Sequence, residues 1–381
     1  MIVFLDESRI KRMADFVSAG ITNEPESFWV CVSAYADSQS ITIWINGTAR
    51  YEAYCGARVI KGGYAWVNAR VFCELAGKVK SDYPSVKIML SEPGDYLSIS
   101  GEGYGYVLPT ADRVASTSDV GRMDGFHKIL VEQLVSVCQN MKVIKEAESD
   151  VDLPVCEIVS GDRVEFVSFT RNRSVCTWIE QEDGMASSLS AFVAIEHLQK
   201  MDKAIKQVLK DDAKATVEIR LFRSCVAFSF SDRSITLRRV EKDKSAIHKL
   251  IDYCRKEDNQ LVTFKVSGKD LKEAYSRLDA FGKRNESSIH RVDFVLQDNA
   301  LRMKAMSQAG SGSETIIVAD KWVNQKANPN HAFAAAGNKL ADLLRISGYQ
   351  TVKMSVLPSS IMLEWDNEKT GNLAILAGLR V

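Results

Sequence analysis

The most regular feature of this chain is an alternation of apolar and polar positions that occurs three times. In each copy the apolar residues lie two apart: Val86, Ile88 and Leu90; Val217, Ile219 and Leu221; Val352, Met354 and Val356. A period of two is typical of a β-strand with one buried face. The copies are roughly 130 residues apart, which is the size of a small domain rather than of a solenoid repeat. The pattern predicts three similar domains.

A stretch with helical periodicity precedes each of these strands. Its apolar residues follow spacings of three and four, which place them on one helical face. They are Val71, Phe72, Leu75 and Val79; Leu198, Met201, Ile205 and Val208; Leu340, Leu343 and Leu344. Two more strands follow each copy, and the short turns between them favour antiparallel pairing. These strands are expected at residues 96–100 and 104–108, 225–230 and 234–237, and 360–365 and 373–376.

The first half of each predicted domain resembles its second half. Helices are expected at residues 8–19, 124–141 and 267–283, and strands follow them, for example at 28–34, 41–45 and 291–296. Each domain would hold two helices and roughly six to eight strands, which makes an α+β unit. We place the three domains at residues 1–118, 119–257 and 258–381.

Composition and charge narrow the classes of partner and compartment. The 49 basic and 49 acidic residues cancel, so no overall field points to a nucleic acid or a membrane. The N-terminal apolar run is too short for a signal peptide, and no stretch has the apolar length of a membrane helix. The eight cysteines are dispersed without a Cys-x-x-Cys pair, which favours reduced thiols over disulfides or zinc ligands. We expect a soluble cytoplasmic protein with no metal or other cofactor.

The sequence offers little to support an enzyme. Gly101, Gly103 and Gly105 form a Gly-x-Gly-x-Gly run, but strands are expected on both sides of it. A hairpin turn is therefore favoured over a phosphate-binding loop. The five histidines lie far apart, and none has metal-binding spacing to a second ligand. No Walker loop, Gly-x-Ser-x-Gly or His-Glu-x-x-His sequence occurs.

One charge pattern points to a partner. Lys200, Lys203, Lys206 and Lys210 form a basic stripe opposite the apolar face of their predicted helix. Taken alone, the stripe has a simpler explanation as a solvated lysine face. Other predicted helices also carry outward cations, however: Arg9, Arg12, Arg70, Lys78, Lys128, Lys269, Lys272, Lys339 and Arg345. If these helices faced a common centre, that centre would be basic and could contact phosphates without reading bases.

Four segments carry a resemblance to a known family. They are residues 67–79 (VNARVFCELAGKV), 106–110 (YVLPT), 161–178 (GDRVEFVSFTRNRSVCTW) and 376–381 (LAGLRV). Each motif is weak by itself, but their order and spacing over the whole chain are specific. The chain resembles, as a divergent member, the bacterial DNA polymerase III beta subunit, which is the beta sliding clamp.

This resemblance implies the DNA-clamp fold, in which each of three similar domains packs two helices on antiparallel sheets. It also implies a head-to-tail homodimer that closes a ring around duplex DNA, with the cations above in weak, sequence-independent contact with the phosphates. The implied role is a non-catalytic processivity factor that tethers the replicative DNA polymerase and other replication or repair proteins, with a clamp loader as a further partner. The alternative is a clamp-derived interaction adaptor, encoded by a phage or mobile element, that is not itself loaded on DNA.

The resemblance further implies a groove for partner peptides and two subunit contacts. The groove carries over onto Phe169, Arg171, Asn172, Arg173, Ser174, Ser245, Lys249, Ala377, Gly378, Leu379 and Arg380. Ala377 and Gly378 stand where the family has Met and Pro, so we expect a different or weaker linear motif. The subunit contacts carry over onto Tyr104, Tyr106, Ala280 and Phe281. For the two tyrosines, an ordinary place on a sheet face is the alternative.

Overall fold

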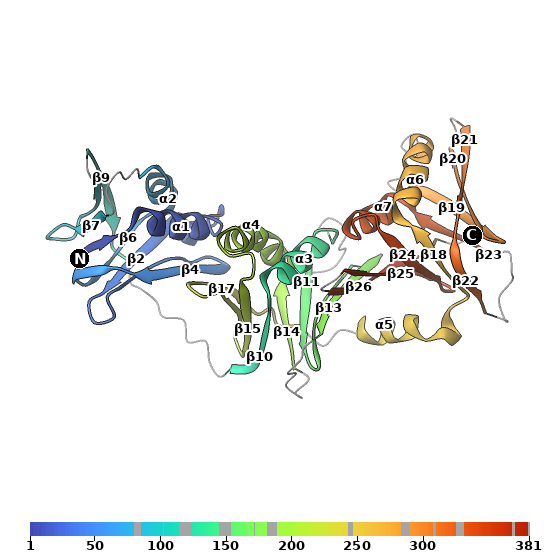
Figure 1. Cartoon of the computed structure of the whole chain (residues 1–381), viewed down its shortest axis with the longest axis horizontal. Helices are drawn as coiled ribbons and strands as arrows, with labels where there is room; N and C mark the ends of the chain where they lie inside the picture. The colour runs from blue at the N-terminus through green and yellow to red at the C-terminus, as the bar shows by residue number, and fades with distance from the viewer. Residues whose placement is uncertain are drawn as a thin grey trace. The chain divides into compact units, whose positions relative to one another are not determined.

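The structure is a computed structural model of the chain. It describes residues 1–79, 85–101, 103–113, 123–144, 154–170, 172–180, 189–242, 247–282, 290–307, 310–324, 331–367 and 370–379. Helices and antiparallel strands follow one another along it (Figure 1), which confirms the α+β class. The chain divides into two compact units: Met1–Cys138 with Ser160–Asp162 and Asp183–Val240, and Gln139–Val159 with Arg163–Glu182 and Glu241–Val381. The three domain boundaries placed on the sequence stay a prediction.

One sheet dominates the first unit. Its strands are β1 (Ile2–Leu5), β2 (Trp29–Tyr35), β3 (Ser40–Ile45), β4 (Ala49–Gly56), β5 (Arg58–Lys61), β6 (Gly63–Asn68), β7 (Val86–Leu90), β8 (Tyr96–Gly101), β9 (Tyr104–Ala111), β10 (Met123–Leu130), β15 (Thr216–Phe222), β16 (Cys225–Ser229) and β17 (Arg233–Arg238). They are ordered β10-β15-β16-β17-β4-β3-β2-β6-β9-β8-β7-β1-β5. The pairing of β17 with β4 places Ile235 opposite Tyr51, so strands from distant parts of the sequence share one sheet.

Three helices accompany this sheet. They are α1 (Glu7–Ser18), α2 (Ala69–Lys78) and α4 (Ile195–Asp211), and α4 follows β14 (Leu189–Ala194) directly. Asp6 caps α1, because its carboxylate accepts a hydrogen bond of 2.7 Å from the backbone N–H of Ser8. The helical periodicity then buries Ile10 and Phe16 completely, and full burial of such a side chain is worth about 1.5–3 kcal/mol. A 3₁₀ turn, η1 (Pro25–Phe28), leads into β2.

The three alternating strands predicted from the sequence are β7, β15 and, in the second unit, β24 (Thr351–Val356). A helix precedes each of them along the chain: α2, α4 and α7 (Gly337–Ile346). Val86, Val217 and Val352 are all fully buried, as a strand with one core face requires. The three predicted alternating strands, each with a helix before it, are therefore confirmed.

The helix predicted over residues 124–141 is wrong for its first part. This segment begins as β10, and only α3 (Val131–Met141) is helical. β10 pairs antiparallel with β15, and Gly125, His127 and Ile129 are buried on its core face. Glycine and histidine do not count as apolar residues. The alternation of apolar and polar positions that predicts a strand is therefore absent from this segment of the sequence. The buried imidazole is satisfied by Ser160, whose Oγ lies 2.6 Å from Nε2 of His127.

The second unit contains two sheets. Its strands are β11 (Val155–Ser160), β12 (Arg163–Phe169), β13 (Arg173–Glu180), β18 (Val262–Ser267), β19 (Arg291–Gln297), β20 (Ala300–Ser307), β21 (Gly310–Ile317), β22 (Ala319–Val323), β23 (His331–Ala336), β24, β25 (Ser360–Asn367) and β26 (Thr370–Ala377). One sheet contains the order β11-β12-β13-β26-β25-β24-β18-β22, and the other has the order β21-β20-β19-β23. The β13–β26 pair sets Val175 opposite Ala374 and so joins the middle of the chain to its end.

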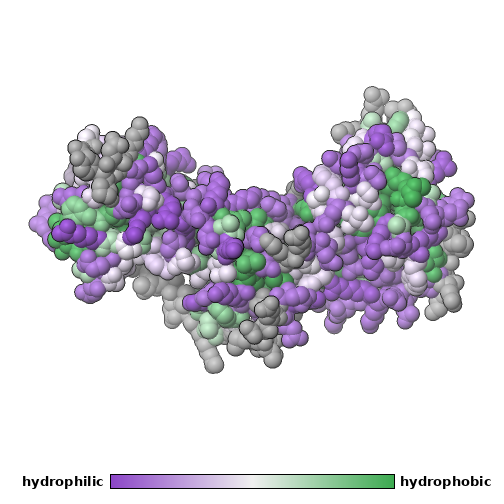
Figure 2. Space-filling model, viewed as in Figure 1, coloured by the Kyte–Doolittle hydropathy of each residue, from purple (hydrophilic) through white to green (hydrophobic). Residues whose placement is uncertain are grey.

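Helices lie on both sides of the larger sheet of the second unit. In Figure 1, α7 and α6 (Gly268–Gly282) lie on one side and α5 (Ile247–Arg255) on the other. No helix was predicted for the α5 segment. It packs Ile247, Ile251 and Cys254 on a cluster that includes Val167 and Ile375, whereas Figure 2 shows a hydrophilic surface on its outer side. A short 3₁₀ turn, η3 (Glu257–Asn259), follows it.

Two further expectations concern the whole chain. All eight cysteines are free thiols, as the sequence predicted, and six of them are buried. None of the helices in the described ranges has the length and apolar character that crossing a membrane requires.

Candidate functional site

A cavity of about 370 Å³ lies beside α5 in the second unit. We call it the groove. Its lining comes from the end of β12, the turn into β13, the first turn of α5, the start of β25 and the end of β26. The residues are Phe169, Thr170, Asn172, Arg173, Ser174, Ile247, Leu250, Ser359, Ser360, Ile375 and Ala377. Apolar side chains flanked by hydroxyl and amide groups are what a pocket for a linear peptide motif offers.

Backbone hydrogen bonds close the groove at its base. The N–H of Thr170 donates to the carbonyl of Arg173 over 2.7 Å, which makes the β12–β13 turn tight. The N–H of Ala377 donates to the carbonyl of Asn172 over 2.8 Å. This second bond joins the β12–β13 turn to the last strand. It therefore brings together the two segments that the family resemblance assigned to one groove.

Charged groups around the groove are mostly engaged within the protein. The Arg173 side chain is fully buried, and its Nη1 donates to Oδ2 of Asp342 on α7 over 3.2 Å. Arg173 therefore supports the groove wall through an ion pair with α7. Lys242 Nζ lies 5.8 Å from the centre of the Phe169 ring, close enough for a cation–π contact. Phe169 thus presents a ring that is apolar on its packed side and has a cation nearby.

All but one of the residues predicted for the groove fall into three groups, and Lys249 is the exception. Phe169, Asn172, Arg173, Ser174 and Ala377 line it. Gly378 and Leu379 line a neighbouring cavity of about 560 Å³, which shares Ser359 and Ser360 with the groove. Arg171, Ser245 and Arg380 lie outside the described residues.

Lys249 does not line the groove. It lies on the exposed side of α5, and the helix turns Ile247 and Leu250 to the groove in its place. Sequence reasoning missed these two residues together with Thr170, Ser359, Ser360 and Ile375. A signal was present in the spacing of Ile247, Leu250, Ile251 and Cys254, which has helical periodicity.

The lysine stripe lies on α4 as predicted. Lys200, Lys203, Lys206 and Lys210 are all exposed. Two of the four ammonium groups meet a carboxylate one turn earlier on the same helix, since Lys200 lies 3.2 Å from Glu196 and Lys206 lies 2.8 Å from Asp202. In the described part of the chain, Lys203 and Lys210 have no such ion pair. These two carry most of the uncompensated charge of the stripe.

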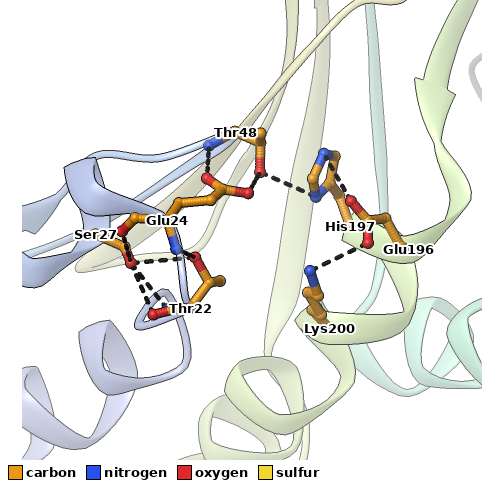
Figure 3. A network of polar contacts seen from close by, with 7 residues as sticks. All are labelled: Thr22, Glu24, Ser27, Thr48, Glu196, His197 and Lys200. Atoms are coloured by element: carbon orange, nitrogen blue, oxygen red, sulfur yellow. Dashed lines mark hydrogen bonds and ion pairs between the residues drawn. The ribbon is translucent and has the colours of Figure 1, made fainter.

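A polar network anchors the first turn of α4 (Figure 3). His197 Nδ1 lies 3.4 Å from the hydroxyl of Thr48, and the Glu24 carboxylate accepts hydrogen bonds from the backbone N–H and the hydroxyl of Thr48. The sticks in Figure 3 also show Glu196 between His197 and Lys200. Burial lowers the pKa of His197 below its ordinary value, so the imidazole is neutral at pH 7. Hydrogen bonds to Thr48, and through it to Glu24, therefore hold the first turn of α4, the helix that carries the lysine stripe, in place.

The other predicted cations occupy helices, with one exception. Arg9 and Arg12 lie on α1, Arg70 and Lys78 on α2, Lys269 and Lys272 on α6, and Lys339 and Arg345 on α7. Lys128 is the exception, because it projects from β10 opposite Glu218 of β15. Its assignment to an outward helix face is wrong, for the same reason that the helix over 124–141 is wrong.

Several of these cations have local partners. Arg9 Nη1 donates to the carbonyl of Gly56 over 2.7 Å, and Arg345 lies 3.3 Å from Asp342. Lys78 pairs with Glu74, and Lys272 Nζ lies 4.2 Å from the centre of the Tyr349 ring. Much of the basic character of these helices is thus compensated nearby.

Of the residues predicted for subunit contact, Tyr104 and Tyr106 lie on β9, and Ala280 and Phe281 lie on α6. The rings of Tyr104 and Tyr106 are 5.5 Å apart on β9, which pairs with β6 only at Thr110 and Ala111. Among the described strands, the stretch from Tyr104 to Leu108 therefore pairs with β8 alone. Phe281, at the end of α6, lies against Gly310 and Gly312 of the edge strand β21, and Ala280 beside it is exposed.

Comparisons with known proteins place the fold. No protein-family model and no curated protein matches the chain. Solved structures match it over its full length. A DNA polymerase III beta subunit from Eubacterium rectale is 15% identical with a TM-score of 0.81, and the match covers 100% of both chains. The chain has the fold of the bacterial beta clamp.

Further beta clamps agree with this. The beta subunit of the DNA polymerase from Streptococcus pyogenes is 14% identical with a TM-score of 0.81, and it also covers 100% of both chains. The Thermotoga maritima beta subunit is 17% identical with a TM-score of 0.78, covering 100% of this chain and 99% of the other. At such identities the likeness is one of fold, and in this respect the predicted resemblance to a divergent beta clamp is confirmed.

Within the described ranges no group of three His, Cys, Asp or Glu side chains is placed to hold a metal ion.

Proposed function

We propose that this protein is a DNA sliding clamp. In this role two copies close head to tail into a ring around duplex DNA, and the ring tethers a DNA polymerase and other replication or repair proteins without catalysing a reaction itself. The observation that carries the proposal is the match to beta clamps over the full length of the chain, together with a groove at the β12–β13 turn and the tail. A cytoplasmic setting, with a clamp loader to open the ring, belongs to the same proposal.

The basic helix faces support contact with DNA. A clamp held by topology needs only weak contacts that slide along the phosphates, and these do not require a strongly positive surface. Lys203 and Lys210 on α4 and Lys269 on α6 are exposed, and no ion pair involves them in the described part of the chain. A few uncompensated cations on two helices fit a mobile, sequence-independent contact better than tight binding.

The groove supports the binding of linear motifs. Ile247, Leu250 and Ile375 offer an apolar wall, and Asn172 and Ser360 add polar groups that can orient a peptide backbone. A buried apolar anchor surrounded by such groups is the usual arrangement of a peptide hot spot. Ala377 leaves less side chain at the tail than the family's Met would, so the favoured motif should fill that space with a larger residue.

Two strand edges support the ring. β9 has an open edge from Tyr104 to Leu108, and β21 is the end strand of its sheet, covered at Gly312 by Phe281. Open edges are templates for pairing with another chain. A head-to-tail dimer would join β9 of one copy to β21 of its partner, and the same contact would recur to close the ring.

The ring can be tested directly. Light scattering should give twice the 42.4 kDa chain mass at micromolar concentration. A clamp loader with ATP should then place the labelled protein on nicked circular DNA, where it should stay through a high-salt wash, because topology is not screened by salt. Cutting the circle should release it, which serves as the control for topological linkage. A monomer that is never retained on the circle would refute the proposal.

A clamp-derived adaptor is the second candidate, and the ion pairs of α4 favour it. Lys200 and Lys206 are compensated by Glu196 and Asp202, so the stripe is half as basic as the sequence indicated. An adaptor would bind a clamp-binding peptide in the groove yet fail to be retained on the circle. Finding both outcomes in the same preparation would establish the adaptor in place of the clamp.

A further inference from the structure

Helix α5 forms one wall of the groove, and its C-terminal end is firmly fixed. The side-chain amide of Gln260 donates to the carbonyl of Cys254 over 2.9 Å, and that of Asn259 donates to the carbonyl of Tyr253 over 2.8 Å. These bonds satisfy carbonyls that the end of a helix leaves open. The Arg255 guanidinium also lies over the Trp178 ring, 4.7 Å from its centre. The far end of α5 is thus held by three side chains.

The groove end of α5 has different attachments. Ile247 is buried, and the next residue, His248, lies between two glutamates of the sheet below. His248 Nε2 is 3.4 Å from Oε2 of Glu157 on β11, and Nδ1 is 3.6 Å from Oε2 of Glu165 on β12. At these distances the contacts are ion pairs rather than well-formed hydrogen bonds. Each nitrogen of the imidazole ring therefore lies near a carboxylate.

The burial of Glu157 gives these contacts weight. Its side chain is only 3% exposed, so its charge requires a compensating partner nearby. Glu165 already accepts from Arg163, whose Nε lies 2.6 Å from its Oε1, and it offers its other oxygen to His248. Neutralising His248 would remove a cation from Glu157 and from one oxygen of Glu165 at the same time.

We propose that His248 is a positioning residue of the groove, which holds the first turn of α5 so that Ile247 and Leu250 form the groove wall. The inference rests on the groove being the peptide site of the proposed function. His248 does not line the groove itself. It acts through two groove-lining residues on the same helical turn: Ile247, directly before it, and Leu250, two residues after it.

This arrangement makes peptide binding depend on pH. The charged groups facing His248 are Glu157 from β11, Glu165 with its partner Arg163 from β12, and Asp252 on the next turn of α5. The two sheet glutamates, Glu157 first, raise the pKa of His248 above its ordinary 6.5. A raised pKa means that the ion pairs are complete below pH 6.5 and are lost as pH rises through the shifted value. The groove wall should therefore loosen on the alkaline side.

A pH series of peptide titrations tests the inference. The probe is a fluorescein-labelled clamp-binding peptide of a bacterial replicative polymerase, titrated with the full-length protein and read by anisotropy. For the wild type we expect the affinity to fall about fivefold from the acid to the alkaline side of the His248 transition, a coupling at the lower end of those seen between linked sites. His248→Gln should bind weakly at every pH with a flat profile. His248→Lys, which keeps a cation at all these pH values, should bind tightly with a flat profile.

Two controls separate positioning from a loss of charge or of folding. Lys249→Gln removes a cation from the next, exposed position of α5 and should keep the wild-type profile. Hydrogen exchange of the α5 amides needs no peptide. At alkaline pH the first turn of α5 should exchange faster in His248→Gln than in His248→Lys, compared at the same pH so that intrinsic rates cancel.

The outcomes distinguish the inference from the function on which it rests. If the wild type binds the peptide but His248→Gln keeps its pH profile and α5 protection, the positioning role is refuted while the groove assignment stands. If no peptide binds at any pH while α5 protection still follows the charge at position 248, the proposed function fails and the coupling of His248 to α5 stands. Equal protection in all variants together with no binding would overturn both.

Discussion

Trp178 lies directly on the backbone of Gly371, its partner across the β13–β26 pair. A Cβ atom at position 371 would lie 2.1 Å from Cε2 of the indole. The same ring carries the guanidinium of Arg163 at 5.2 Å and that of Arg255 at 4.7 Å from its centre. One glycine thus lets a tryptophan sit low enough to hold both a strand arginine and the end of α5.

Gly371→Ala should therefore destabilise the protein. Overpacking a filled site costs about 1–3 kcal/mol, and here the ring rather than a flexible chain end would have to move. The control is Gly77→Ala on α2, where an added Cβ meets no atom within 4 Å. Because alanine is the better helix former, this control should gain about 0.5–1 kcal/mol. Thermal unfolding followed by circular dichroism should move in opposite directions for the two variants, and equal shifts would contradict the packing argument.

Charge reversals on α4 should have unequal effects on DNA. Lys203→Glu with Lys210→Glu removes cations that no carboxylate on α4 compensates, whereas Lys200→Glu with Lys206→Glu removes two that are already paired. We expect the first pair of changes to weaken DNA association more. If both lysines contact phosphates, the salt dependence of its affinity should also fall by about 1.8 units of logarithmic slope. Binding to a short DNA duplex at several salt concentrations measures this, with dimer mass as the folding control. Equal losses would assign the stripe to a solvated face.

Leu250 should contribute more to peptide affinity than Tyr253. Both residues are exposed apolar side chains on α5, at 41% and 46%, but only Leu250 lines the groove. We expect Leu250 to be one of the minority of interface residues whose truncation costs more than about 1 kcal/mol, up to the hot-spot level of about 2 kcal/mol. Leu250→Ala should thus weaken the labelled clamp-binding peptide roughly five- to thirtyfold. Tyr253→Ala is the matched control and should leave affinity unchanged. A result in the reverse order would move the binding surface to the outer side of α5.

His197 should make the first unit less stable in acid. Burial lowers the pKa of its imidazole in the folded state, so the unfolded chain takes up a proton more readily. Stability supplied by neutral His197 is complete above its ordinary pKa of 6.5 and is lost as pH falls toward the lowered value. His197→Gln should flatten this part of the curve of unfolding free energy against pH. Because His248 changes stability in the opposite direction, its Gln variant should not flatten the same window.

Phe281 should be needed for the dimer. Its ring lies against Gly310 and Gly312 at the edge strand β21, where the proposed partner strand would pair. Phe281→Asp should give a folded monomer, because a carboxylate at an apolar edge opposes pairing. Light scattering measures the mass, and Val107→Asp on β9 should have the same effect because this 65% exposed residue lies on the opposite proposed contact. A dimer that survives both changes would place the subunit contact elsewhere.

The elements that the sequence predicted well are those whose buried face is made of strongly apolar residues. β7, β15 and β24 fall in this class, because Val, Ile, Leu and Met alternate with polar residues along them. β10 does not, since Gly125 and His127 occupy its core face. Its burial depends on a polar partner, Ser160, that lies well beyond the local window. A pattern of apolar residues within a short window cannot predict that such a polar residue is buried.

The candidate site was predictable in its strands but not in its wall. Phe169, Asn172, Arg173, Ser174 and Ala377 carried over from a sequence resemblance and do line one cavity. The wall made by Ile247 and Leu250 required the helix α5, which that resemblance did not contain. Lys249 was assigned to the groove without knowledge of this helix, and on α5 it lies on the exposed side.

By itself, the sequence determined the α+β class and the three alternating strands with a helix before each, because these depend on spacings within a few residues. Only the tertiary structure decided which polar groups meet. Arg173 meets Asp342, which lies far along the sequence on α7, and Asn172 and Ala377 become neighbours only through the β13–β26 pair. Such ion pairs and cavity walls are made by residues far apart in the sequence, and these residues come together only when the chain folds.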